Sequence, residues 1–537
     1  MSAATDADRT NATGGFFGHP KGLSTLFFTE MWERFSFYGI RPLMVLFMTA
    51  ALLDGGYAYD RGYAGAIVGI YAGSVYLSAL PGGWIADRIL GLRKAILIGA
   101  ILISLGHISI GLSAFAGGPT PFFIGLILIV LGTGLLKPNI SAIVGDLYPE
   151  GGERRDAGFS IFYMGINIGA FAGQLVTGFL GEVYGWHWGF GAAGAGMLIG
   201  TLVFALRTPK TLGDIGLEPS HHPDPEINRQ QVSRAKLALY AGLAIIALVV
   251  ILAMTGTITL DPEVLGTYFV YVILGLAFAF FAYVLAFGGL TGDEKKRMVV
   301  IMVLFLAAAV FWSAFEQAPT SLNLFARDFT DRTLFGTLSG DSLIPATWFQ
   351  SINSLFIIAL APLFAIMWTR MGKKGIHLSY PVKFALGLAF AAVGFFVMIF
   401  AANIVVSGGA DTLVSPWWLV ASYFFQTVGE LFLSPVGLAS MTVLSPRRYV
   451  GQMMGIWFMA SALGNLIGGL VAGNVDPERL EQMPILFTWT AGSLIVAAIV
   501  LGLLAIPIAR MMKSVRGGES GLVDEGMVAV DMPPEKE

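Results

Sequence analysis

The chain has 537 residues, of which 55% are hydrophobic and only 12% are charged. A net charge of −3 gives no basic surplus for binding nucleic acid, and the absence of cysteine excludes disulfides and thiolate metal sites. Apolar stretches of twenty or more residues recur along the whole length, which indicates a polytopic helical membrane protein.

Fourteen apolar stretches are long enough to cross a bilayer as helices. They are about Leu23–Leu53, Tyr63–Ile89, Lys94–Phe115, Pro121–Asp146, Ala157–Val183, Trp188–Leu206, Lys236–Ile258, Leu265–Leu290, Met298–Phe325, Leu343–Trp368, Pro381–Val405, Pro416–Val443, Val450–Val471 and Pro484–Met512. A polar connector, Arg207 to Ala235, follows the sixth stretch. We therefore expect six helices, an inserted pair and six more. The predicted divisions are 1–20, 21–207, 208–292, 293–513 and 514–537.

Basic residues gather in alternate loops, and the connector also carries several of them. They include Arg88, Arg93, Lys94, Arg154, Arg155, Arg207, Lys210, Lys295, Lys296, Arg297, Lys373, Lys374, Arg447 and Arg448. Because basic loops stay on the cytoplasmic side of a membrane, the pattern predicts that both chain ends and the connector are cytoplasmic.

The first apolar stretch contains Glu30, Glu33 and Arg34, whose spacing places them on one face of a helix. Tyr38 and Arg41 continue along that face. A charge near the membrane centre costs roughly 2.5–3.5 kcal/mol, so such residues pair or face a polar interior. The group is either an ion pair that only fixes helix packing or a polar track for a substrate or protons.

Two further stretches of the first half carry polar side chains. Lys137 lies too far from either end of its stretch to reach water easily, which favours a cation facing a cavity. Pro138 follows it and loosens the helix there. Tyr163 and Asn167 are four residues apart on one face, a pattern that by itself more often marks a hydrogen bond between helices.

The second half contributes two deep acids and several aromatic and amide side chains. These candidates are Trp312, Glu316, Asn323, Glu430, Ser434 and Trp457. By themselves, the two tryptophans fit ordinary packing aromatics equally well. Over the whole chain, four deep acids face three deep bases. One negative charge therefore remains if all of them ionise, and one acid can hold a proton in some states.

Three sequence motifs resemble those of the proton-dependent oligopeptide transporter family. They are Glu-x-x-Glu-Arg-Phe-x-x-Tyr at 30–38, Lys-Pro-Asn at 137–139, and Phe-Tyr-x-x-Ile-Asn-x-Gly-Ala at 162–170. The family usually has Tyr-Tyr where this chain has Phe37-Tyr38. The segment Gly82–Lys94 also resembles the loop between helices two and three of the major facilitator superfamily.

The resemblance implies an all-α major facilitator fold with two six-helix bundles and an inserted helix pair. It implies an inner-membrane symporter that imports di- and tripeptides with protons by alternating access, with the proton as coupling ion, no other cofactor, and a monomeric state. The implied proton-coupling residues are Glu30, Glu33, Arg34 and Glu316. The implied peptide-binding residues are Tyr38, Arg41, Tyr76, Lys137, Tyr163, Asn167, Trp312, Asn323, Glu430, Ser434 and Trp457. Arg41–Glu316 and Lys137–Glu430 are the implied gate salt bridges.

Other interpretations remain open at this point. Relatives of the family carry other anionic or amphoteric solutes such as nitrate. A membrane sensor or a polytopic enzyme would belong to a different class, but the chain has no nucleotide-binding loop, metal-ligand cluster or Ser/His/Asp set. We expect His107, in the third stretch, to be a hydrogen-bonded packing residue, because its neighbours are apolar.

Overall fold

The structure is a computed structural model that describes residues 15–113, 115, 118–220, 223–333, 343–376 and 378–516. The predicted terminal segments, 1–20 and 514–537, lie largely outside these residues. Apart from one isolated bridge between Thr330 and Val414, the described secondary structure is helical. The all-α prediction is thus confirmed.

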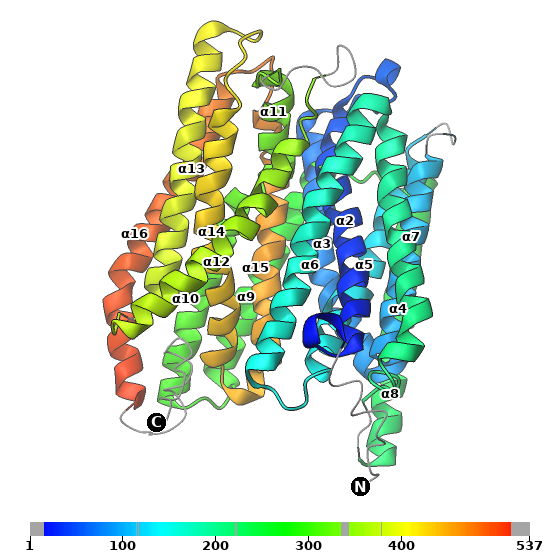
Figure 1. Ribbon diagram of the computed structural model, residues 1–537, viewed down its shortest axis with the longest axis vertical. Helices are drawn as coiled ribbons and strands as arrows, with labels where there is room; N and C mark the ends of the chain where they lie inside the picture. Colours follow the sequence, from blue (N-terminus) through cyan, green and yellow to red (C-terminus); the bar gives the residue numbers. More distant parts are fainter. Residues whose placement is uncertain are drawn as a thin grey trace. The chain divides into compact units, whose positions relative to one another are not determined.

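Fourteen long helices account for most of the described chain (Figure 1). They are α2 (Lys21–Thr49), α3 (Arg61–Ile85), α4 (Leu92–Leu112), α5 (Thr120–Asp146), α6 (Gly152–Phe179), α7 (Trp186–Thr211), α8 (Pro225–Met254), α9 (Pro262–Phe287), α10 (Gly292–Phe315), α12 (Trp348–Lys373), α13 (Tyr380–Gly408), α14 (Trp417–Val443), α15 (Val450–Leu470) and α16 (Gln482–Arg516). Shorter elements are α11 (Asn323–Phe329), η1 (Phe16–Gly18), η2 (Leu52–Asp54), η3 (Ala86–Leu90), η4 (Leu180–Tyr184), η5 (Ala318–Leu322), η6 (Arg447–Tyr449) and η7 (Ala472–Asn474).

Helix α2 differs from the other long helices in its charge. Thirteen helical segments of the described chain are long and apolar enough to cross a membrane, and α2 is not one of them. Its four central ionisable residues are buried, as are most of the apolar residues around them. The predicted count of fourteen helices therefore holds, with one of them adapted to the protein interior rather than to lipid.

The described residues form two compact units. Unit 1 comprises Met1–Tyr59 and Ser74–Leu265, and unit 2 comprises Asp60–Gly73 and Gly266–Glu537. Helix α8 thus belongs to unit 1, whereas most of α9 belongs to unit 2. The boundaries predicted from the sequence stay predictions.

Each unit contains a helix pair whose backbones approach closely at glycines. In unit 1, a Cβ added to Gly99 would lie 2.5 Å from the Gly132 carbonyl oxygen, and one added to Gly106 would lie 2.7 Å from that of Gly125. In unit 2, a Cβ on Gly429 would lie 2.5 Å from the Gly387 carbonyl oxygen. These contacts bring the backbones of α4 and α5, and of α13 and α14, too close for any larger residue.

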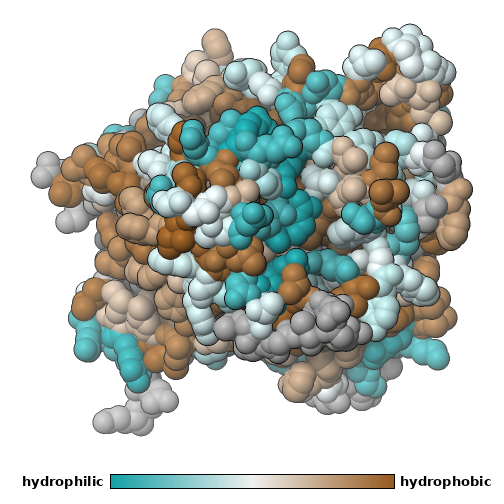
Figure 2. Space-filling view, turned by 90° about the horizontal axis from the view of Figure 1, so that it is seen from above, coloured by the Kyte–Doolittle hydropathy of each residue, from teal (hydrophilic) through white to brown (hydrophobic). Residues whose placement is uncertain are grey.

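The inserted helices expose mostly apolar side chains. Examples are Leu237, Ile245 and Ile251 on α8 and Tyr271 and Leu276 on α9, all more than half exposed. In the view from above, hydrophobic side chains cover much of the outer flank (Figure 2). This is the surface expected of helices in contact with lipid.

The connector before α8 is attached to the loop between α3 and α4. Arg93 donates to the Gly213 carbonyl, the Ser220 amide donates to the Asp87 carbonyl, and Arg88 donates to Gln231 on α8. Gly91 has a φ of +77°, so the loop adopts a conformation that side chains rarely permit. The connector therefore packs as a part of unit 1.

Candidate functional site

The charged face of α2 is a compact ion cluster inside unit 1. Arg34 Nε lies 2.9 Å from Glu30 Oε1 and 2.6 Å from Glu33 Oε2. All three residues are at most 3% exposed. One guanidinium thus serves two carboxylates, which leaves one net negative charge in the cluster when both acids are ionised. Glu33 Oε1 accepts no hydrogen bond from the described residues.

Phe37 lies between the two arginines of α2. The guanidinium carbons of Arg34 and Arg41 lie 5.3 and 5.4 Å from the centre of its ring. Such distances permit favourable interaction of both cations with the ring face. The sequence analysis noted Phe37 only as a departure from the family pattern, although its spacing of three from Arg34 and four from Arg41 was a signal that the three share a helix face.

Lys137 stacks on an aromatic ring within unit 1. Its Nζ lies 4.2 Å from the ring centre of Tyr76, which α3 contributes. At 1.5 Å per residue, Lys137 is about 14 Å from the end of α5 at Asp146. The structure therefore brings together a cation and a tyrosine that the sequence had singled out separately.

The polar residues of α6 differ in exposure. Tyr163 is 50% exposed, whereas Asn167 is 6% exposed. The Asn167 amide donates to the Tyr163 carbonyl at 3.0 Å, a bond within α6. The predicted pair does share a helix face, and the Tyr163 ring is the more accessible of the two side chains.

In unit 2, Glu316 lies where α10 ends. Its backbone N–H still bonds the Trp312 carbonyl at 2.9 Å, but Pro319 then interrupts the helical ladder and η5 begins at Ala318. Glu316 is 6% exposed, and Asn323, at the start of α11, is fully buried. Gly464 and Gly468 of α15 pack directly against Trp312 and Glu316.

Glu430 is held by a neutral amide. Asn353 on α12 donates to Glu430 Oε2 at 3.1 Å and to the Thr427 hydroxyl at 2.9 Å. Asn353 was not among the residues predicted from the sequence, although an asparagine inside an apolar stretch is a visible signal. Ser434 lies one turn beyond Glu430 and is half-buried.

Trp457 is 6% exposed and packs over Gly437 of α14, where a larger residue would meet its ring.

His107 is buried in α4, and neither ring nitrogen has a hydrogen-bond partner among the described residues. The packing part of its prediction holds, since Gly194 of α7 packs against the His107 Cβ, but the expected hydrogen bond is not found among the described residues.

The predicted site residues thus form two sets, one in each unit. Within unit 1 the structure joins Glu30, Glu33 and Arg34, and separately Tyr76 and Lys137. Within unit 2 it links Glu430 to Asn353. The two predicted gate bridges, Arg41–Glu316 and Lys137–Glu430, pair residues of different units and stay predictions.

Comparison with known proteins gives consistent results. Residues 93–211 and 275–485 match the family model described as the POT family. The peptide transporter YePEPT of Yersinia enterocolitica is 50% identical over 518 residues, covering 95% of this chain and 99% of the relative. A di-/tripeptide transporter of Lactococcus lactis is 35% identical over 510 residues, covering 93% and 98%.

Solved structures agree with the sequence relatives. A crystal structure of a peptide transporter POT in complex with sulfate has a TM-score of 0.84 and 39% identity, covering 94% of this chain and 98% of that one. A POT family transporter in complex with 5-aminolevulinic acid has a TM-score of 0.82 and 33% identity, covering 94% and 99%. These matches confirm the predicted major facilitator fold.

Proposed function

The chain belongs to the POT family, and from this premise we propose that it imports di- and tripeptides together with protons. The observation that carries the proposal is the opposite charge of the two sets. Beyond its ion cluster, unit 1 contains buried Arg41 and half-buried Lys137, whereas unit 2 contains buried Glu316 and half-buried Glu430. A zwitterionic substrate requires a cation at one end of its site and an anion at the other.

In this proposal the peptide carboxylate binds Arg41 and Lys137, and the peptide ammonium binds Glu430. Asn167 and Asn323 hold the peptide bond or the termini. The aromatic residues Tyr38, Tyr76, Tyr163, Trp312 and Trp457 form the side-chain pockets, and Ser434 lines the site beside Glu430. The fixed charges select for length, because a longer peptide would leave one buried charge without its partner.

Proton coupling is assigned to the α2 cluster. Glu30 and Glu33 compete for the single guanidinium of Arg34, at 2.9 and 2.6 Å, so protonation of one acid strengthens the pairing of the other. Glu316 is the second candidate for the coupling proton. The transporter requires no cofactor beyond that proton.

Alternation of access requires contacts that form in one state and open in another. The Arg41–Glu316 and Lys137–Glu430 pairs are the proposed gates, and their charges are complementary. A peptide that binds Lys137 and Glu430 through its own termini would compete with the second pair. Substrate binding would thereby favour its opening.

Competition by three ligands tests the orientation: a dipeptide, its amine-acetylated form and its carboxyl-amidated form. Glu430→Gln should reduce the affinity penalty for acetylation, and Lys137→Gln should reduce the penalty for amidation. Equal effects of both variants on both analogues would show that the orientation is wrong. If the wild type accumulates no labelled peptide in proteoliposomes under an inward proton gradient, the function itself is refuted.

The chain is a multi-span membrane protein, and we place it in the bacterial inner membrane as a monomer with both termini cytoplasmic. The alternating basic loops support this orientation. An introduced cysteine would be the single labelling site, because the native chain has no cysteine. Ser220 is exposed in the connector. A cysteine at Ser220 should resist a membrane-impermeant reagent in intact cells and react after permeabilisation, and labelling in intact cells would reverse the orientation.

A further inference from the structure

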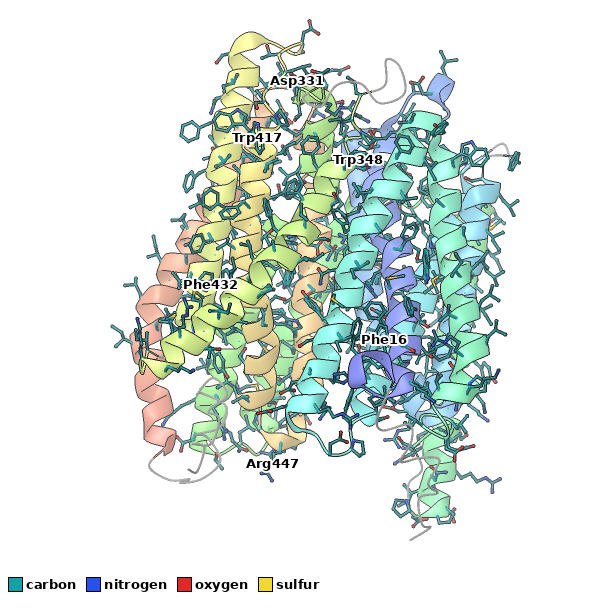
Figure 3. All side chains as sticks on the ribbon, in the orientation of Figure 1. Phe16, Asp331, Trp348, Trp417, Phe432 and Arg447 are labelled. Carbon is teal, nitrogen blue, oxygen red and sulfur yellow. The ribbon has the colours of Figure 1, made fainter. Side chains whose placement is uncertain are left out.

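Helices α12 and α14 of unit 2 are joined by hydrogen bonds at two successive levels. At the first level, Gln350 Nε2 lies 2.6 Å from the Tyr423 hydroxyl. At the second, Asn353 donates to both Thr427 and Glu430. Figure 1 shows α12 crossing α14 obliquely, and Figure 3 marks Trp417 and Phe432 on α14 to either side of these contacts.

The spacing makes the two levels parts of one arrangement. Gln350 and Asn353 are three residues apart on α12, and Tyr423, Thr427 and Glu430 follow at intervals of four and three on α14. Residues at these intervals lie on the same side of a helix. The Thr427 hydroxyl also donates to the Tyr423 carbonyl at 2.7 Å, which fixes its orientation toward Asn353. The Gln350–Tyr423 bond thus fixes how α12 lies along α14, and this places Asn353 within reach of Thr427 and Glu430.

Gln350 makes a second bond that reaches the break in α10. The same Nε2 donates to the Ala318 carbonyl at 2.7 Å. In an uninterrupted α-helix this carbonyl would accept from the Leu322 N–H, but that N–H bonds Gln317 instead, at 3.1 Å. Gln350 therefore binds a carbonyl at the start of the π-helical segment η5, two residues after Glu316.

These contacts lie inside the protein, where a lost partner is costly. Gln350 is 5% exposed, Tyr423 is 2% exposed and Thr427 is fully buried. Removing one partner of a buried hydrogen bond costs about 1–3 kcal/mol because the other partner stays without water. The arrangement is therefore strong enough to hold Asn353 in place.

A neighbouring glutamine shows that burial of an amide on these helices does not by itself produce such a link. Gln426 on α14 is 1% exposed, yet its amide donates only to Ser422 one turn away, at 2.9 Å. Its oxygen has no hydrogen-bond partner among the described residues. Gln350, by contrast, contacts two other elements.

We propose that Gln350 and Tyr423 are positioning residues that hold the Asn353 amide on the Glu430 carboxylate and tie this acid to the helix break after Glu316. The inference rests on the proposed function, because it treats Glu430 as the site of the peptide ammonium. It adds two residues that influence peptide recognition through Asn353 and Glu430. Loss of the link lets α12 shift against α14, so that Asn353 no longer orients the carboxylate toward the ammonium.

The test measures the acetylation penalty, defined as the Kd of an amine-acetylated dipeptide divided by the Kd of the free dipeptide. The purified full-length chain is used with Gln350→Leu, Tyr423→Phe and the double variant. Gln426→Leu is the matched control, since it also replaces a buried amide on this helix pair. Tyr423→Phe removes a single oxygen, so it keeps the test valid if Gln350→Leu fails to fold.

Gln350→Leu should reduce the acetylation penalty about tenfold, and Tyr423→Phe about threefold, as expected for one lost hydrogen bond. The double variant should match Gln350→Leu, because both changes break the same link. Gln426→Leu should keep the wild-type penalty.

Three results would overturn the inference. They are an unchanged penalty in Tyr423→Phe, additive effects in the double variant, or an equal loss of affinity for both ligands, which a merely structural role would produce. If the wild type transports peptide but the variants give one of these results, only this inference fails. If the wild type binds no peptide, the proposed function fails as well.

Discussion

The two units of the molecule hold their buried charges in different ways. In unit 1, two carboxylates and one guanidinium pair within a single helix at 2.6–2.9 Å. In unit 2, Glu430 receives its contact from the neutral amide of Asn353 on another helix. A local ion cluster can exchange protons without large movement, whereas the amide contact orients the Glu430 carboxylate for a ligand. Under the proposed function, this difference suits proton coupling in unit 1 and binding of the peptide ammonium in unit 2.

The largest expected effect comes from removing one acid of the α2 cluster. Glu33→Gln should abolish uptake driven by a proton gradient, while peptide exchange retains a substantial part of its rate. Glutamine cannot bind or release a proton, whereas Arg34 keeps Glu30 as its partner at 2.9 Å, so coupling is lost while the helix keeps an ion pair.

Accumulation and exchange in proteoliposomes measure the two activities of Glu33→Gln. Ser36→Ala is the control, because its hydroxyl donates only to the Glu33 carbonyl within the helix, at 2.9 Å. Accumulation by Glu33→Gln with the wild-type pH dependence would move proton coupling away from this cluster. Glu316 in unit 2 would be the next residue to test.

A charge reversal between the units should have the next largest effect. Lys137→Glu and Glu430→Lys should each reduce peptide exchange more than tenfold, since each leaves two like charges where the gate forms. The double variant should recover exchange to several times the rate of either single variant. Exchange by the double variant at or below the single-variant rates would count against direct pairing of these residues.

A smaller effect is expected where unit 2 does use ion pairs. Asp328 lies 2.6 Å from Arg61 and 2.7 Å from Arg327, and Arg61 also donates to the Val475 carbonyl. Asp328→Asn should lower the melting temperature by several degrees, because two partly buried cations lose their acid. Arg479→Gln is the control, since its pair with Asp476 is about half exposed on the arginine side. Equal melting temperatures for the two variants would contradict the expected importance of the Asp328 cluster.

The smallest effect is expected at His107 in unit 1. His107→Leu should leave uptake unchanged and keep or slightly raise the melting temperature, because neither ring nitrogen has a partner among the described residues. Burying an unsatisfied polar group costs about 1–3 kcal/mol, and leucine removes that cost. A loss of uptake in a stable His107→Leu protein would show that unit 1 uses a further polar site.

Much of this protein could be predicted from its sequence. Apolar stretches of bilayer length predicted the fourteen long helices, because a backbone in lipid must satisfy its hydrogen bonds within the helix, although α2 is too charged to count among the thirteen candidate membrane spans of the described chain. The interval between Glu30 and Arg34 predicted their pairing, since residues four apart share a helix face. Both inferences depend on geometry inside one element.

Only the tertiary structure decided which helices meet and which side chains therefore touch. It placed Tyr76 under Lys137, Asn353 on Glu430, and Gln350 between Tyr423 and the Ala318 carbonyl. It also left His107 facing a glycine rather than a hydrogen-bond partner. The physical reason is that the spacing along a helix fixes the direction of a side chain. The partner it finds depends on the packing of another helix, which no local pattern encodes.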